Sequence, residues 1–159
     1  MSIKLHVAVL NRGWIRRETH YALNQMEKTK GVEVILHPLN RSFHNPIFAN
    51  RNILSKEFLK TDCDFHMQID DDVVPIHHNP AELVFANKDI IGCPAKVRQY
   101  GKTLSWVAFV KHPTLEGYAP VDFSTADDTV DLLEVDVVGT GLILIRRNVL
   151  ETLWIRYSC

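Results

Sequence analysis

The sequence has few cysteines, almost no net charge and no long hydrophobic run, and each of these absences excludes a class of protein. Its three cysteines, Cys63, Cys93 and Cys159, show neither paired nor metal-ligand spacing, which favours a reducing compartment over a disulfide-bonded fold. The formal net charge of -1 gives no whole-chain attraction to nucleic acid or to an anionic membrane. Partners are therefore expected at local sites.

Secretion and membrane signals are also missing. The apolar run within residues 1–10 is too brief for the core of a signal peptide and has no cleavage pattern. Residues 135–145 are the most apolar stretch, but they include Asp136 and two glycines and are too short to span a bilayer. We therefore expect a cytoplasmic protein with no transmembrane segment. With 159 residues, 46% of them hydrophobic, it fits a single domain over residues 1–159.

Hydrophobic periodicity predicts a βαβ unit at the start of the chain. Apolar and β-branched residues predict buried strands at residues 3–10 and 32–36. Between them, apolar side chains at helical spacing predict a helix over residues 14–28, with Gly31 as its C-terminal cap. Because a strand, a helix and a strand in this length form a βαβ unit, we expect the sheet to begin parallel.

A second helix is predicted from Asn45 and Pro46, as N-cap and first helical residue, to about residue 60. Its apolar stripe consists of Ile47, Leu54 and Phe58. Arg51 falls on the same stripe, so its cation must either reach outward to solvent or find an anionic partner.

The remaining elements are expected to be shorter. We expect a strand at residues 65–69, a short helix at 79–86, a strand at 89–93, a β-hairpin of 97–100 and 104–110, a long loop at 111–131, strands at 134–138 and 142–145 around a glycine turn, and a helix from 149 to about 155. Together these elements predict an α/β fold with an open, mixed, mostly parallel sheet flanked by helices.

Three consecutive carboxylates, Asp70, Asp71 and Asp72, follow the third predicted strand, at the edge where open α/β sheets bind ligands. Adjacent like charges repel one another, and a divalent cation would stabilise them. Mg²⁺ takes one or two carboxylates and fills its other positions with water and phosphate oxygens. The cluster therefore predicts a metal site for a nucleoside diphosphate, with a solvated acidic turn as the alternative.

The acidic triplet resembles the DxD signature of glycosyltransferases with the GT-A fold. Residues 49–54, Ala-Asn-Arg-Asn-Ile-Leu, resemble the ARN segment that precedes the DxD strand in family 2-like glycosyltransferases. Residues 135–147 resemble the acceptor-side strand and glycine turn of the same enzymes. The likeness covers nearly the whole chain in order. It implies a GT-A-like (Rossmann-like) fold and metal-dependent transfer of a sugar from a UDP- or GDP-linked donor to an acceptor.

The resemblance also implies roles for individual residues. Asp72 would be the principal ligand of Mn²⁺ or Mg²⁺, and Asp70 would share the metal or meet the ribose. The other implied donor nucleotide-binding residues are Asn11, Arg12, Arg51 and Asp71, and those on the acceptor or sugar side are Gly139, Thr140 and Gly141. A plain strand-to-helix turn is the alternative for the first two, and a tight turn that needs positive φ is the alternative for the two glycines.

The sequence departs from that family at its C-terminal end. Inverting GT-A enzymes carry a catalytic Asp or Glu on a helix beyond the glycine-turn strand, and this sequence ends where that segment should begin, so we expect the catalytic-base segment to be lacking. Asp127 and Asp128 in the long loop are substitute catalytic candidates, although a solvated loop is the favoured interpretation.

Other residues with possible chemistry have ordinary structural interpretations. We expect His77 and His78 to lie in a surface loop, because adjacent side chains in an extended segment point opposite ways and cannot easily bind one metal. Trp106 and Tyr118 could stack on a sugar ring, with core packing favoured for Trp106.

Two other functions remain open. A phosphohydrolase of the haloacid dehalogenase type would use the pattern of Asp70, Asp72 and Val74, but two strands and two helices precede it here and no clear later Lys and acidic pair follows. A non-catalytic binding module would keep the fold without the catalytic base.

Overall fold

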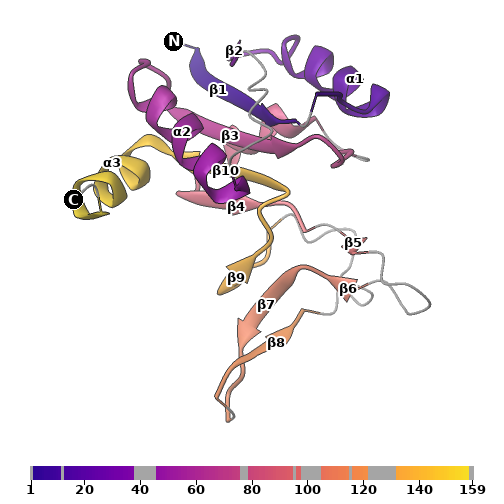
Figure 1. Cartoon of the computed structure of the whole chain (residues 1–159), viewed down its shortest axis with the longest axis vertical. Helices are drawn as coiled ribbons and strands as arrows, with labels where there is room; N and C mark the ends of the chain where they lie inside the picture. Colours follow the sequence, from indigo (N-terminus) through magenta and orange to yellow (C-terminus); the bar gives the residue numbers. More distant parts are fainter. Residues whose placement is uncertain are drawn as a thin grey trace.

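Five strands form the central mixed sheet in this computed structural model (Figure 1). The structure describes residues 2–11, 13–37, 46–75, 79–94, 96–97, 105–114, 116–121 and 132–157. The strands are β1 (Ile3–Leu10), β2 (Val32–Leu36), β3 (Phe65–Asp70), β4 (Ile90–Gly92) and β10 (Leu142–Arg146). Their order in the sheet is β2-β1-β3-β10-β4. β1 pairs in parallel with β2 and β3, whereas β10 runs antiparallel to β3 and β4.

The strand order reverses at β1. The chain passes from β1 through α1 (Arg17–Met26) to β2, and then through α2 (Ile47–Leu59) to β3 on the other side of β1. Such a reversal leaves a crevice outside the carboxyl ends of the two strands, because their connections leave toward opposite sides. The carboxyl ends of β1 and β3 therefore define the expected ligand edge of the sheet.

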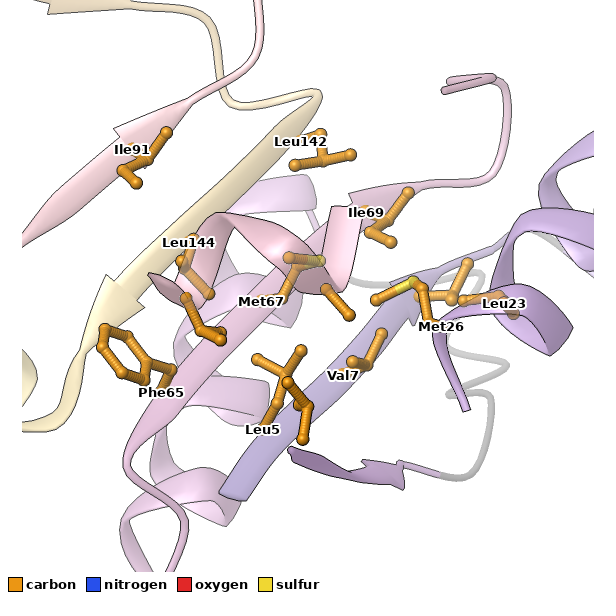
Figure 2. Packing of buried hydrophobic residues seen from close by; sticks show 14 residues of the cluster. Leu5, Val7, Leu23, Met26, Phe65, Met67, Ile69, Ile91, Leu142 and Leu144 are labelled. Carbon is orange, nitrogen blue, oxygen red and sulfur yellow. The ribbon is translucent and has the colours of Figure 1, made fainter. Parts of the chain in front are cut away.

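The two faces of the sheet differ in chemistry. The face toward α1 is apolar: alternate residues of β1, β3 and β10 pack there with the helix (Figure 2). This cluster includes Leu5, Val7, Val9, Leu23, Met26, Phe65, Met67, Ile69, Leu142 and Leu144, and it extends to Ala81 and Val84 of the 3-10 helix η1 (Pro80–Ala86). The opposite face has a smaller apolar cluster, in which Phe58 of α2 and Leu150 of α3 (Arg147–Tyr157) meet Cys63.

A smaller antiparallel part extends from the central sheet (Figure 1). Three strands, β7 (Ala108–Lys111), β8 (Tyr118–Pro120) and β9 (Val137–Val138), form a sheet of order β8-β7-β9. Two further strands, β5 (Lys96–Val97) and β6 (Ser105–Trp106), pair with each other. Within the described part of the chain, no helix is long and apolar enough to cross a membrane.

The structure confirms the predicted α/β class, the parallel βαβ unit and the bounds of its strands. The first helix is shorter than predicted, since it begins at Arg17 and ends at Met26. Gly31 is not its cap: with φ of 83°, it lies in the turn that enters β2, where Val32 N donates to Thr29 O at 3.2 Å.

The prediction for α2 is confirmed in part. Arg51, Leu54 and Phe58 face inward, but Ile47 in the first turn is 56% exposed and does not belong to the buried stripe. Pro46 is the N-cap, rather than the first helical residue, and Asn45 lies outside the described residues.

The predictions for the second half of the chain are confirmed in part. The expected loop at residues 111–131 contains β8, which pairs with β7. Strands lie on both sides of the glycine turn as predicted, although the first is shorter: β9 joins β7, and β10 enters the central sheet between β3 and β4. The predicted hairpin is confirmed in part: β5 pairs with β6, but residues 108–110 of its second arm belong to β7 in the other sheet, and its turn lies outside the described residues.

Candidate functional site

The three aspartates lie where β1, β3 and β10 meet. The amide of Asp71 donates to the carbonyl of Leu10 at the end of β1, at 3.1 Å. The amide of Asp70 donates to the carbonyl of Gly141, just before β10, at 2.8 Å. Because β10 is antiparallel to β3, its beginning meets the carboxyl end of β3. Segments near positions 10, 70 and 141 thus form one edge.

The carboxylates differ in accessibility. Asp71 is buried at 5% exposure, the side chain of Asp70 is 22% exposed, and Asp72 is exposed. Within the described residues, no group of three His, Cys, Asp or Glu side chains could hold a metal ion. A cation here would therefore rely on Asp70 and Asp72, together with water or phosphate oxygens, which is the arrangement that suits Mg²⁺.

Arg51 of α2 reaches the cluster from above the sheet. Its Nη2 donates to Asp70 Oδ1 at 2.7 Å, and its Nη1 donates to Gln68 Oε1 at 3.1 Å. The Arg51 side chain is only 14% exposed. Of the two alternatives for a cation on the inward stripe, Arg51 therefore pairs with an anionic partner and does not extend to solvent. The guanidinium brings positive charge to the edge where a polyanion would bind.

A row of buried polar side chains continues from Arg51 along β3. Gln68 Nε2 donates to the carbonyl of Arg51 at 3.2 Å and to Ser55 Oγ at 3.1 Å, and it lies 2.9 Å from His66 Nε2. His66 Nδ1 lies 2.9 Å from His6 Nδ1 on β1. This row was not predicted from the sequence. Its signal was the alternation of polar residues at positions 66, 68 and 70, which places them on one face of the strand.

The two buried histidines are held neutral. Burial, and secondarily the proximity of His37, lowers the pKa of His6 to about 4. Burial, and then the neighbouring His6 and His37, lowers the pKa of His66 to about 3. His66 also stacks on Phe58, with ring centroids 4.9 Å apart. At neutral pH each ring therefore carries one proton, and their short contact must pair one donor with one acceptor.

The two glycines before β10 allow the backbone there to lie close to side chains of the same protein. Neither Gly139 nor Gly141 has positive φ. A Cβ at Gly139 would lie 2.9 Å from Val107 Cγ1, and one at Gly141 would lie 3.0 Å from Val73 Cγ2 and 4.0 Å from Asp70 Oδ2. Gly141 thus lets β10 start directly beside the acidic turn, and Thr140 lies between the two glycines.

The connection between β1 and α1 is tied to the same turn. Asn11 is buried, and its Oδ1 accepts from the amide of Gly13 at 2.9 Å, so its side chain makes the predicted strand-to-helix turn. Thr19 Oγ1 in the first part of α1 donates to the carbonyl of Val73 at 2.9 Å. The role of Thr19 was not predicted from the sequence, because only the fold shows that this helix start lies beside the acidic turn.

Several predicted residues cannot be placed. Arg12, His77, His78, Asp127 and Asp128 lie outside the described residues, and so does the side chain of Trp106. Tyr118 is 59% exposed on β8, opposite Lys111 of β7.

No protein-family model matches the chain. No curated protein matches it either. Among solved structures, that of A197 from STIV aligns with 94% of this chain and 67% of its own, at a TM-score of 0.60 and 19% sequence identity. At this identity the likeness shows a shared mixed α/β fold and assigns no activity.

Proposed function

We propose that this chain is a donor-binding domain of the GT-A type, which binds a nucleoside-diphosphate sugar through a divalent cation and transfers the sugar to an acceptor. One observation carries the proposal: Asp70 and Asp72 lie at the carboxyl end of β3, beside the point where the strand order reverses, with the Arg51 guanidinium 2.7 Å from Asp70. The sequence resemblance in residues 49–54 and 135–147 adds support, because these segments meet the acidic turn from α2 and β10.

The donor set fits Mn²⁺ or Mg²⁺. Asp70 and Asp72 are the accessible carboxylates, and two such groups together with phosphate oxygens satisfy a hard cation. A bound cation would supply neutralisation of the diphosphate leaving group. Arg51 positions Asp70 and adds a fixed positive charge next to the developing phosphate charge.

The pairing of Asp70 with Arg51 disfavours the phosphohydrolase alternative. In that reaction the first aspartate would attack phosphorus, and its oxygen would have to be directed at the substrate. Here one oxygen of Asp70 accepts a charge-assisted hydrogen bond, which stabilises the carboxylate and reduces its nucleophilicity. The non-catalytic module makes the same contacts as the enzyme, so turnover separates the two.

The test is a calorimetric titration of the chain with UDP and with GDP, each with and without Mn²⁺. We expect Mn²⁺-dependent binding of one nucleotide, and a loss of affinity of at least about tenfold in Asp72→Asn (~1.4 kcal/mol). Asp62→Asn is the matched control, because Asp62 pairs with Lys4 at the opposite, amino-terminal edge of the sheet. Equal binding by Asp72→Asn and the unaltered chain would contradict the proposed metal site.

Turnover is measured separately. Incubation with a nucleotide sugar and Mn²⁺ should release the nucleoside diphosphate, and an aryl phosphate with Mg²⁺ should release no phosphate. Nucleotide binding without release would indicate the non-catalytic module, and phosphate release that needs no nucleotide would indicate the hydrolase.

A further inference from the structure

Behind the acidic turn, an unbroken row of polar side chains runs between α2 and the sheet. It begins at Asp70 and Arg51 and passes through Gln68, His66 and His6 to His37, whose Nδ1 lies 3.3 Å from His6 Nε2. His66, His6 and Gln68 are 0%, 1% and 4% exposed. Water therefore has little access to the middle of the row, and each polar group there must form its hydrogen bonds with its neighbours in the row.

The charged end of the row determines the direction of every hydrogen bond. Arg51 cannot lose its proton and has no acceptor, so Gln68 must turn its oxygen toward Arg51 and its NH₂ toward His66. Because that NH₂ cannot accept a hydrogen bond, His66 Nε2 carries no proton, and the single proton of this neutral ring lies on Nδ1. That proton is donated to His6 Nδ1, which leaves the proton of His6 on Nε2, where it is donated to His37.

A proton added to either buried ring breaks this order at Gln68. An extra proton on His66 lies on Nε2, opposite the Gln68 NH₂. An extra proton on His6 forces His66 into the tautomer that also carries its proton on Nε2. Gln68 could accept from that N–H only by rotating its amide, and its NH₂ would then oppose the guanidinium of Arg51. The hydrogen bond between Gln68 and Arg51 is thus coupled to the protonation of both imidazoles.

Among the described residues, several titratable or charged side chains surround the two rings. The titratable and charged side chains around them are His37 after β2, Arg51 and Glu57 of α2, Cys63 before β3, Asp70 at the end of β3, and Arg147 of α3. Glu57 already accepts from Lys60 at 2.7 Å. Arg147 lies over the Phe58 ring, 4.6 Å from its centroid, and that ring stacks on His66.

We propose that Gln68 is a positioning residue of the nucleotide site: its amide, oriented between Arg51 and the His66–His6 pair, holds Arg51 on Asp70 and couples that hold to the protonation of the buried imidazoles. The consequence of this proposal is that nucleotide affinity depends on Gln68, and this consequence rests on the proposed function. The hydrogen-bond order itself is independent of that function.

The hydrogen-bond order is tested by ¹⁵N NMR of the histidine rings in the full chain at pH 7.5. In the unaltered protein we expect protons on His66 Nδ1 and His6 Nε2, and bare nitrogens at His66 Nε2 and His6 Nδ1. In Gln68→Glu, a carboxylate faces His66, so we expect a proton on His66 Nε2. The opposite tautomers in the unaltered chain, which need no variant to observe, would overturn the proposal.

The positioning role is tested with Gln68→Met, which keeps the side-chain length but removes both the acceptor and the donor. We expect it to increase the mobility of the Arg51 guanidinium, measured from the ¹⁵N line shapes of its side chain, and to weaken binding of Mn²⁺ with UDP or GDP about tenfold. Asn24→Met is the matched control, since it makes the same kind of change on the exposed surface of α1 and should change affinity less than twofold.

The outcomes separate the two proposals. If the unaltered chain binds neither nucleotide while Gln68→Met still releases Arg51, the proposed function fails and the positioning of Arg51 is supported. If the unaltered chain binds a nucleotide and Gln68→Met binds it equally well, the positioning role of Gln68 is overturned and the proposed function stands. Circular dichroism of each variant confirms that the comparison is made between folded proteins.

Discussion

At the residue scale, Asp70 and Asp72 share one proposed metal-binding role but lie in different environments. Asp70 neutralises Arg51, whose side chain is only 14% exposed, whereas Asp72 is exposed. We expect Asp70→Asn to lower the free energy of unfolding by about 2 kcal/mol, because it leaves a largely buried cation without its charged partner. Asp72→Asn should change it by less than about 0.5 kcal/mol. Urea denaturation at pH 7.5 measures both.

The comparison separates stability from ligand binding, because both variants are expected to lose Mn²⁺-dependent nucleotide binding. Arg51→Met offers a further check: combined with Asp70→Asn, it should cost less than the sum of the two single changes, since the pair is removed together. Equal stability losses in the two aspartate variants would show that the Arg51–Asp70 pair does not hold α2 on the sheet.

Residue-level prediction from the sequence succeeded where a side chain's neighbours are local. Arg51 could be assigned to the inward face because helical spacing relates it to Leu54 and Phe58. The link between His66 and His6 could not be predicted, because the two rings are 60 positions apart and meet only through the pairing of β1 with β3. The row of polar residues on β3 was visible, but its partners were not.

At the element scale, the C-terminal end of α2 is secured by a side chain from another helix. Arg147, the first residue of α3, donates through Nε to the carbonyl of Cys63 and through Nη2 to that of Thr61, each at 2.7 Å. We expect Arg147→Lys to lower the free energy of unfolding by about 1–3 kcal/mol, because an ammonium cannot reproduce the planar, multiple donation. Arg17→Lys, on the exposed surface of α1, is the control in the same denaturation experiment.

Retention of wild-type stability by Arg147→Lys would mean that the charge alone, through its contact with the Phe58 ring, accounts for the role of Arg147. Hydrogen exchange localises the effect, since the last turn of α2 should exchange faster in Arg147→Lys while α1 is unchanged.

Element prediction was most accurate for the two strands of the βαβ unit. β1 and β2 begin and end at the predicted residues, because largely apolar, β-branched runs bounded by turn residues leave few alternatives. The short strands β8 and β9 are two or three residues long, too short for a period to be recognised. Proximity in sequence does not reveal pairing either, since β9 and β10 flank one glycine turn but belong to different sheets.

At the scale of the whole molecule, the candidate site depends on one topological feature that the sequence does not reveal. β10 lies between β3 and β4, so the start of an antiparallel strand meets the ends of parallel ones. A purely parallel sheet would place Gly141 at the opposite edge from Asp70. The sequence predicted the residues of this edge, and the insertion of β10 brings them together.

The whole molecule should also be destabilised by mild acid through its buried histidines. Burial lowers the pKa of His6 to about 4 and that of His66 to about 3, from a value near 6.5 in the unfolded chain. Between pH 6.5 and about 4 the unfolded state therefore binds more protons than the folded state. The stability that the neutral rings contribute is present above pH 6.5 and is lost as the pH falls through this window.

We expect the free energy of unfolding to decrease as the pH is lowered from 6.5 to 4.5, and His6→Asn to reduce the slope by about 1.4 kcal/mol per pH unit, which corresponds to one proton fewer taken up on unfolding. Asn keeps a polar atom near the position of Nδ1, so His66 retains a partner. His20→Gln, which removes an exposed histidine of α1, should leave the slope unchanged. Chemical denaturation at a series of pH values gives these slopes directly. Carboxylates contribute to this slope mainly below their own pKa values near 4. An unaltered slope in His6→Asn would therefore mean that the His66–His6 pair is charged in the folded protein. That result would contradict the hydrogen-bond order that Arg51 imposes through Gln68.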